Sequence, residues 1–166
     1  MIAMVAVLAA KYFYLVSLAI TGYAFLKLNR EKRWRFVYFA GLGLPLVFIL
    51  SRIASYFYFD PRPFVLHHFT PLIAHLPDNG FPSDHALLAF ALMALVYLFD
   101  SKLGIILGLL GIVISWSRIY VGLHSPLDVS AGFGLSVLGF LTTYLIFKKT
   151  PLEKTLTGWR SKFSSK

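Results

Sequence analysis

Long apolar runs, separated by short polar segments, dominate the chain. A helix of about 20 residues crosses roughly 30 Å of membrane hydrocarbon, and five runs are about that long. They cover residues 2–26, 36–58, 82–100, 103–121 and 127–147. Backbone groups in lipid must hydrogen-bond within their own segment, so these runs predict helices and not an open sheet. The predicted fold is an all-α integral membrane bundle with about five transmembrane helices.

The third and fourth runs are separated by little more than Asp100, Ser101 and Lys102, which predicts an antiparallel helical hairpin. Small residues let helices approach closely, and the last two runs contain several glycines. We expect them to pack within the bundle, and a homodimer contact is the alternative; they are Gly104, Gly108, Gly132, Gly134 and Gly139.

Composition agrees with a membrane protein. The 166 residues are 58% hydrophobic and only 14% charged, which indicates one integral membrane domain. The first run lacks the basic start and small-residue cleavage site of a signal peptide, so we expect a retained span. No cysteine is present, which excludes a disulfide framework and a thiolate metal site. We therefore predict a transmembrane domain over 1–149 and a basic tail over 150–166.

Basic residues predict the orientation of the spans. In a five-span arrangement, twelve of the 16 Lys and Arg residues fall on one side, in the first loop, the hairpin turn and the tail. The positive-inside rule makes that side cytoplasmic, so the N-terminus lies outside and the C-terminus lies inside. The net charge of +9 is then explained by topology and by attraction to anionic lipid, without nucleic acid. The tail is either an interfacial helix or a disordered segment.

Three arginines lie at the outer ends of spans, where this rule gives no reason for them: Arg52, Arg62 and Arg118. All five histidines map to the same side, as do four aspartates: His67, His68, His75, His85, His124, Asp60, Asp78, Asp84 and Asp128. Ionisable groups near spans usually have a function or a partner. We therefore predict a polar site at the outer end of the bundle.

Two clusters precede or begin the third run. In "DPRPF", residues 60–64, two prolines stiffen the chain around Arg62, whose donor fork suits phosphate oxygens. In "PSDH", residues 82–85, the proline suits a first helical turn, where free N–H groups favour an anion. Ser83 adds a hydroxyl donor, and His85 has a pKa suited to proton transfer. Asp84 could simply favour the helix N-terminus.

The third cluster is "SRIYVGLHSPLD", residues 117–128. Arg118 ends the fourth run, His124 lies in a tight outer turn, and Asp128 lies in the first turn of the fifth run. An imidazole can attack phosphorus if a carboxylate accepts its other N–H and fixes the tautomer. The four-residue step from His124 to Asp128 allows that contact.

Together these clusters resemble the three-part signature of the type 2 phosphatidic acid phosphatase superfamily, spread over residues 52–128. The wider segments "YFDPRPFVLHHFTPLIAHLPDNGFPSDHA" and "SRIYVGLHSPLDV" are similar to the bacitracin-resistance type of bacterial undecaprenyl-diphosphate phosphatase. In that branch Asp commonly stands at the position of Asp84. Two departures are Ser55, where many members carry a lysine, and a chain shorter than that of many relatives.

The resemblance implies a phosphatase that needs no metal or other cofactor. His124 would attack the terminal phosphorus to form a phosphohistidine, and Asp128 would orient and stabilise the imidazolium. His85 would protonate the leaving oxygen and then activate the water that releases phosphate. Four side chains would hold the phosphate oxygens, with Asp84 in support: Arg62, Ser83, Arg118 and, in place of the missing lysine, Arg52.

The implied substrate is undecaprenyl diphosphate, met at the outer face of a bacterial plasma membrane. Phosphatidylglycerol phosphate, phosphatidic acid and lipid A 1-phosphate are alternative substrates. A small transporter is the alternative outside enzymes, and it would place ionisable groups near mid-bilayer, where Lys11 is the only candidate. Imidazole and carboxylate groups of the outer loop, at His67, His68 and His75, offer a metal site as a further alternative.

Overall fold

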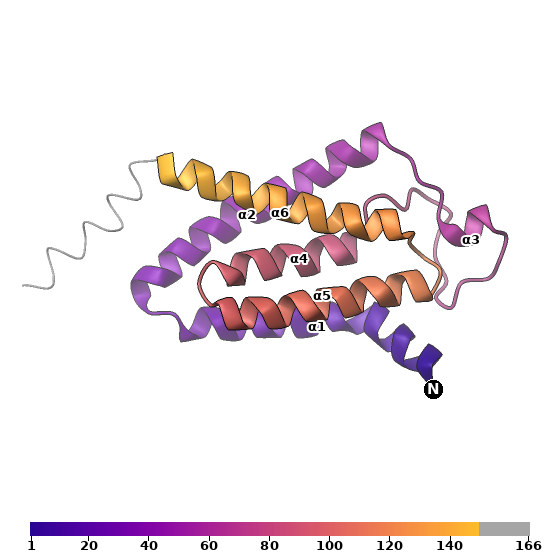
Figure 1. The fold of residues 1–166 in the computed structure, drawn as a ribbon, viewed down its shortest axis with the longest axis horizontal. Coiled ribbons are helices and arrows are strands. Elements are labelled where there is room, and N and C mark those ends of the chain that lie inside the picture. The colour runs from indigo at the N-terminus through magenta and orange to yellow at the C-terminus, as the bar shows by residue number, and fades with distance from the viewer. Residues whose placement is uncertain (150–166) are drawn as a thin grey trace, which may run out of the picture.

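The computed structural model describes residues 1–149, and its regular elements there are all helices, without a β-sheet, as the all-α prediction expects. The predicted tail, 150–166, lies outside the described residues. The helices, shown in Figure 1, are α1 (Ile2–Lys27), α2 (Arg30–Phe57), α3 (Pro63–Leu66), α4 (Asp84–Tyr97), α5 (Ser101–Tyr120) and α6 (Pro126–Lys149).

Capping side chains set where two of these helices begin. The side chain of Asn29 accepts a hydrogen bond from the backbone N–H of Lys32 at 3.0 Å, so α2 begins at Arg30 and not at residue 36 as predicted. The basic residues assigned to the first loop therefore lie largely in the first turns of α2. Asp100 caps α5 in the same way through the N–H of Leu103, at 3.1 Å.

The third predicted span, 82–100, is wrong in length. Its helix, α4, has 14 residues, about 21 Å at 1.5 Å per residue, which is less than roughly 30 Å of hydrocarbon. The backbone at Ser83 is extended, and Asp100 leaves the helix to cap α5, so both ends are shortened. The other four long helices, α1, α2, α5 and α6, are long and apolar enough to cross a membrane.

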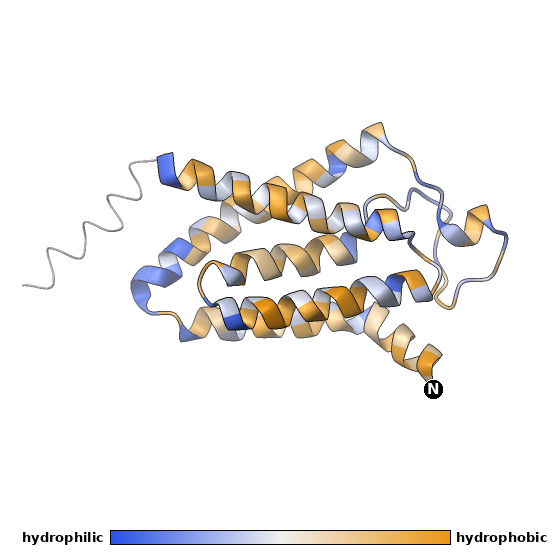
Figure 2. Ribbon diagram, in the orientation of Figure 1, coloured by the Kyte–Doolittle hydropathy of each residue, from blue (hydrophilic) through white to orange (hydrophobic). Residues whose placement is uncertain are grey.

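α4 is instead the central helix of the bundle. It packs against α1, α2, α5 and α6, and eight of its 14 residues are buried. The four long helices around it expose large apolar side chains, and much of their ribbon is orange, the colour of hydrophobic residues, in Figure 2. A water-filled environment would penalise such a surface, whereas lipid does not.

Glycines provide the close contacts between helices, as predicted for three positions. A Cβ added at Gly104 would lie 2.6 Å from Cα of Tyr97, and one at Gly132 would lie 2.9 Å from the backbone nitrogen of Leu87. A Cβ at Gly139 would lie 2.5 Å from Cγ2 of Val47, between α6 and α2. These glycines therefore serve packing within the bundle.

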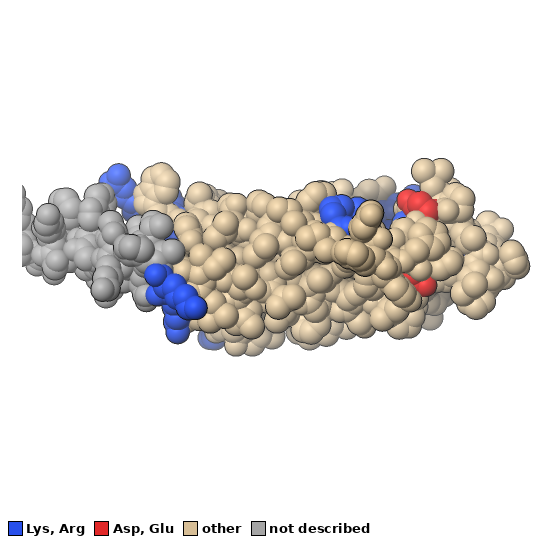
Figure 3. Space-filling view, turned by 90° about the horizontal axis from the view of Figure 1, so that it is seen from above, with Lys and Arg blue, Asp and Glu red and all other residues tan. Residues whose placement is uncertain are grey.

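Charged side chains gather at the two ends. Figure 3 shows Lys and Arg at the end where α6 finishes, and Asp and Glu toward the opposite end together with a further group of Lys and Arg. At the acidic end, the segment 58–83, which contains α3, folds over the start of α4 and the α5–α6 turn. We call residues 58–83 the outer loop.

Candidate active site

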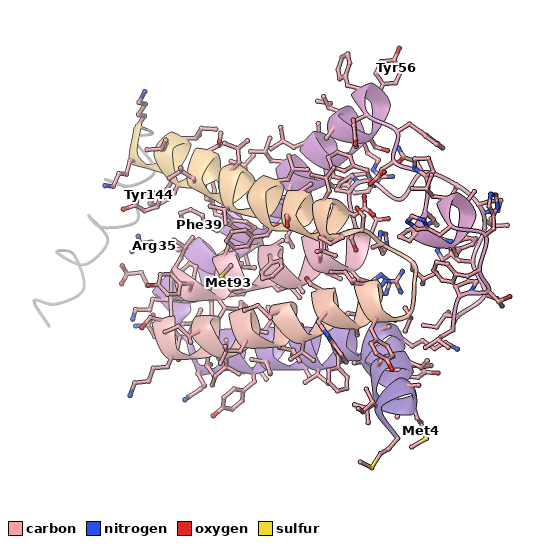
Figure 4. All side chains as sticks on the ribbon, turned by 45° about the vertical axis from the view of Figure 1, so that its right-hand side comes forward. Met4, Arg35, Phe39, Tyr56, Met93 and Tyr144 are labelled. Carbon is pink, nitrogen blue, oxygen red and sulfur yellow. The ribbon has the colours of Figure 1, made fainter. Side chains whose placement is uncertain are left out.

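Backbone hydrogen bonds draw three distant segments together at the start of α4. The N–H of Gly80 donates to the carbonyl of Asp60 at 2.9 Å, which folds the outer loop on itself. The N–H of Ser83 donates to the carbonyl of Asp128 at 3.1 Å, which ties the start of α4 to α6. Figure 4 shows the nitrogen and oxygen atoms of many side chains crowded at this end, whereas Met93 lies farther along the bundle.

His124 stands at the centre of this cluster. It lies in the turn between α5 and α6 and is only 4% exposed. Its Nδ1 is 3.0 Å from the carbonyl oxygen of Gly80 and 3.3 Å from Oδ2 of Asp128, so the predicted His–Asp contact is present. A carbonyl oxygen can only accept a hydrogen bond. Nδ1 therefore carries the proton, and Nε2 keeps its lone pair.

Two buried arginines face that lone pair. Nη1 of Arg62 and Nη2 of Arg118 each lie 3.4 Å from Nε2 of His124. Burial lowers the pKa of His124, the hydrogen bond to Asp128 opposes this, and the positive charge of the two arginines lowers the pKa further. The net lowering favours the neutral imidazole, which is the nucleophilic form.

Each arginine is fixed by protein groups. Arg62 is 6% exposed, donates from Nε to Oδ1 of Asp78 at 2.6 Å, and donates from Nη1 to the carbonyl of Leu123 at 3.0 Å. Arg118 is 5% exposed and donates from Nη1 to the carbonyl of Ala10 on α1 at 3.3 Å. Both guanidinium groups are therefore preorganised around His124, as the stabilisation of an anion requires.

A second carboxylate supports Asp128. The N–H of Ser125 donates to Oδ2 of Asp128 at 2.8 Å, and the hydroxyl of Ser125 donates to Oδ2 of Asp60 at 2.9 Å. Burial raises the pKa of Asp60, the hydrogen bond from Ser125 opposes this, and the charge of Asp128 raises the pKa further. The sequence placed Asp60 at the outer end without giving it a role, and did not predict its contact with Ser125, because that contact joins the outer loop to the α5–α6 turn.

Asn79 organises the outer loop and was also missed. Its Oδ1 accepts from the N–H groups of Asp60 and Phe81, each at 3.0 Å. Its Nδ2 donates to the carbonyl of Tyr58 at 3.0 Å and to Oγ of Ser55 at 3.1 Å. Ser55, which stands at the position of the missing motif lysine, therefore helps to hold the outer loop through Asn79. The turn sequence "DNG" was the available signal for an asparagine in such a role.

A cavity of about 180 Å³ opens beside His124. His85, in the first turn of α4, lines it, and the ring of Tyr14 on α1 meets the ring of His85 edge-on, with 5.6 Å between centroids. The cavity therefore brings together the two histidines that the sequence singled out for the reaction, His85 and His124. Its other lining residues are Arg52, Ser55, Arg62, His75, Asp78, Asn79, Phe81, Pro82, Asp84 and Arg118.

Three predicted site residues take positions outside the buried cluster around His124. Ser83 is fully buried against α6, is absent from the cavity lining, and its hydroxyl has no hydrogen-bond partner within residues 1–149. Arg52 and Asp84 form an ion pair at 2.8 Å, with side chains 47% and 69% exposed, at the rim of the cavity. Arg52 and Asp84 are therefore much more exposed than the residues of the buried cluster.

The histidines of the outer loop do not come together. Within the described part of the chain, no group of three or more His, Cys, Asp or Glu side chains has an arrangement that could hold a metal ion. His75 lines the cavity and lies 3.6 Å from Oδ1 of Asp78. The chemistry available at the cavity is thus that of three imidazoles, three guanidinium groups and their carboxylate partners.

Comparisons with known proteins agree with this arrangement. A family model described as the PAP2 superfamily matches residues 36–151. The chain is 32% identical over 145 residues to undecaprenyl-diphosphatase BcrC of Bacillus subtilis, covering 84% of this chain and 73% of that protein. It is also 32% identical over 145 residues to a bacitracin transport permease protein BcrC of Bacillus licheniformis, covering 87% of this chain and 69% of that protein.

Among solved structures, the fold is similar to that of LpxE from Aquifex aeolicus. The TM-score is 0.61 at 25% sequence identity, and the match covers 78% of this chain and 86% of that one. The family match includes all three sequence clusters around the cavity.

Proposed function

Because the chain belongs to the PAP2 superfamily, we propose that it removes the terminal phosphate of undecaprenyl diphosphate and so recycles the carrier lipid of cell-wall synthesis. It is a multi-pass membrane enzyme of the lipid-phosphatase class. The observation that carries the proposal is the position of Nε2 of His124, 3.4 Å from a guanidinium nitrogen of each of two buried arginines.

The first half of the reaction forms a phosphoenzyme. Nε2 of His124 attacks the terminal phosphorus, and the bond from that phosphorus to the bridging oxygen breaks. His85 donates its proton to the leaving oxygen, which departs as undecaprenyl phosphate. Arg62 and Arg118 hold the non-bridging oxygens and offset the charge of the transition state, while Asp128 stabilises the imidazolium.

The second half regenerates the enzyme. His85, now neutral, takes a proton from a water molecule as that water attacks the phosphohistidine. The bond between phosphorus and Nε2 breaks, and inorganic phosphate leaves. In this scheme the enzyme supplies its own nucleophile and its own cations, so we propose that it needs no metal ion.

The substrate proposal draws on the curated relatives, one of which is named an undecaprenyl-diphosphatase. Phosphatidylglycerol phosphate, phosphatidic acid and lipid A 1-phosphate stay as alternatives, because each presents the same terminal group to His124. The name of the Bacillus licheniformis relative refers to transport. A transporter gives no role to a neutral histidine held between a carboxylate and two arginines, so we favour the enzyme.

The decisive experiment measures phosphate release by the detergent-purified protein with excess EDTA, comparing undecaprenyl diphosphate with phosphatidylglycerol phosphate. We expect release from the diphosphate that is abolished in His124→Ala and kept in His67→Ala, a control in the outer loop outside the cavity. Faster release from phosphatidylglycerol phosphate would keep the mechanism and change the substrate. Activity that survives His124→Ala, or is lost with EDTA, would contradict the mechanism.

We also propose that the site faces the outside of a bacterial plasma membrane. The support is the excess of Lys and Arg at the opposite end, which the positive-inside rule assigns to the cytoplasm. A reporter fused after Lys149 should therefore be cytoplasmic. If that reporter were found outside the cell, the site would face the cytoplasm and the proposed role in recycling would lose its basis.

A further inference from the structure

Lys11 is a cation without a partner inside an apolar helix. It lies in α1, which has no other charged side chain from Ile2 to Ala24. Among the described residues, it has no hydrogen-bond or ion-pair partner. A charged side chain within a membrane helix is costly and normally faces a partner or a polar cavity. Lys11 lines a cavity of about 430 Å³.

The position of Lys11 is tied to the active site. The residue before it, Ala10, is fully buried, and its carbonyl accepts the hydrogen bond from Nη1 of Arg118 at 3.3 Å. One turn further along α1, Tyr14 meets the ring of His85. Ala10, Lys11 and Tyr14 all line the same cavity. Lys11 therefore lies between the α1 residues that contact Arg118 and His85, both of which take part in the proposed reaction.

The cavity of Lys11 adjoins the cavity of His124. Four residues line both of them: His75, Asp84, His85 and Arg118. The smaller cavity also contains His124 and the other two arginines. The larger one combines Lys11 with apolar side chains, namely Ala10, Ile73, Leu88 and Leu123. A substrate can thus extend from one cavity into the other past His85.

The direction of the substrate follows from the chemistry. The terminal phosphorus must lie at Nε2 of His124, in the smaller cavity. The leaving oxygen must lie at His85, which borders both cavities. The group bonded to that oxygen can then enter the larger cavity, which His85 also lines. In a diphosphate this group is the second phosphate, whereas in a monophosphate it is a carbon of the lipid.

We propose that Lys11 binds the second phosphate of a diphosphate substrate and gives the enzyme its preference for diphosphates over monophosphates. This inference rests on the proposed function. A lysine suits the role because its ammonium is a point charge on a flexible chain that can reach a phosphate in several geometries. The apolar residues of the same cavity would contact the first isoprenyl carbons beyond that phosphate.

Two substrates with the same lipid chain provide the test: farnesyl diphosphate and farnesyl phosphate, hydrolysed by the full chain in detergent. For Lys11→Met, we expect kcat/KM on the diphosphate to fall about 10- to 100-fold, the effect of one charge-assisted hydrogen bond. On the monophosphate it should change by less than about twofold. Lys11→Arg should keep most of the preference.

The matched control is Lys27→Met, at the other end of α1, where Nζ lies 5.1 Å from the ring centroid of Tyr23. It should leave both substrates unaffected. Hydrolysis of the monophosphate by Lys11→Met also shows that this variant is folded.

The outcomes separate this inference from the proposed function. If Lys11→Met slows both substrates equally, or neither, Lys11 does not read the second phosphate and the inference fails while the phosphatase activity stands. An equal effect would place Lys11 on the terminal phosphate or in the fold. No effect would mean that its ammonium extends to the lipid headgroups. If the wild type releases phosphate from neither substrate nor from undecaprenyl diphosphate, the proposed function fails as well.

Discussion

Replacing Asp128 with Asn tests how the nucleophilic imidazole is oriented. Two acceptors face Nδ1 of His124, and the carbonyl of Gly80, at 3.0 Å, is closer than Oδ2 of Asp128, at 3.3 Å. Asp128 is 1% exposed and also accepts from the N–H of Ser125 at 2.8 Å. An amide oxygen at residue 128 can still accept that hydrogen bond, so we expect the variant to fold.

The size of the effect depends on which acceptor sets the tautomer. If Gly80 holds the proton on Nδ1, the variant loses only the negative charge beside the imidazolium. A hydrogen bond to a charged group contributes about 1.5–3 kcal/mol, which predicts phosphoenzyme formation about 10- to 100-fold slower. If Asp128 alone set the tautomer, the loss would be about 10⁴-fold, as in a Ser-His-Asp triad.

The measurement is a single-turnover rapid-quench experiment with substrate labelled in the terminal phosphate. The labelled protein is counted over time for the wild type and for Asp128→Asn, with His124→Ala as the blank. Thermal unfolding of each variant checks the fold. A rate as low as that of the blank would refute the role given to Gly80. A rate within about threefold of the wild type would refute the stabilisation of the imidazolium by Asp128.

Three further predictions concern packing, pH and the arginines. Gly139→Ala should lower the free energy of unfolding, measured by denaturation, by about 1–3 kcal/mol, because its Cβ would lie 2.5 Å from a methyl carbon of α2. Gly134→Ala should not lower it, because nothing lies within 4 Å of its Cβ. The lowered pKa of His124 should keep phosphoenzyme formation active below pH 6.5, so an acid limb at or above that pH would contradict it. Arg118→Gln should lower kcat/KM by about 10²–10³-fold, and the rim variant Arg52→Gln by less than about fivefold.

The sequence predicted the parts of the site that depend on short-range geometry. His124 and Asp128 are four residues apart around the start of α6, and the turn alone brings them together. Arg118 precedes the same turn, at the end of α5. In each case the spacing along the chain nearly determines the spacing in the structure.

Contacts of the outer loop could not be predicted in this way. The carbonyl of Gly80 is the nearest acceptor to His124, but a backbone carbonyl has no signature in the sequence. The hydrogen bonds of Asn79 join residues 19 and 24 positions apart, and only the folded loop brings them together. Ser83 was expected at the phosphate; its side chain is fully buried and its hydroxyl has no hydrogen-bond partner within residues 1–149, so its contact with phosphate stays a prediction.

The positive-inside rule predicts few cations at the end of the bundle where α4 starts, yet two buried arginines lie there. The short length of α4 explains their presence. Figure 1 shows the start of α4 set back from the neighbouring ends of α1 and α5, so the site lies inside the bundle beneath the outer loop. Arg62 and Arg118 there bond to protein groups and are almost fully buried. They are shielded from lipid, unlike the exposed basic residues at the other end of the bundle. A five-span arrangement with full-length helices explains neither the 14 residues of α4 nor the arginines at this end. Both features follow if the site is recessed within the bundle, because a short α4 leaves room for it and its buried arginines bind an anion there.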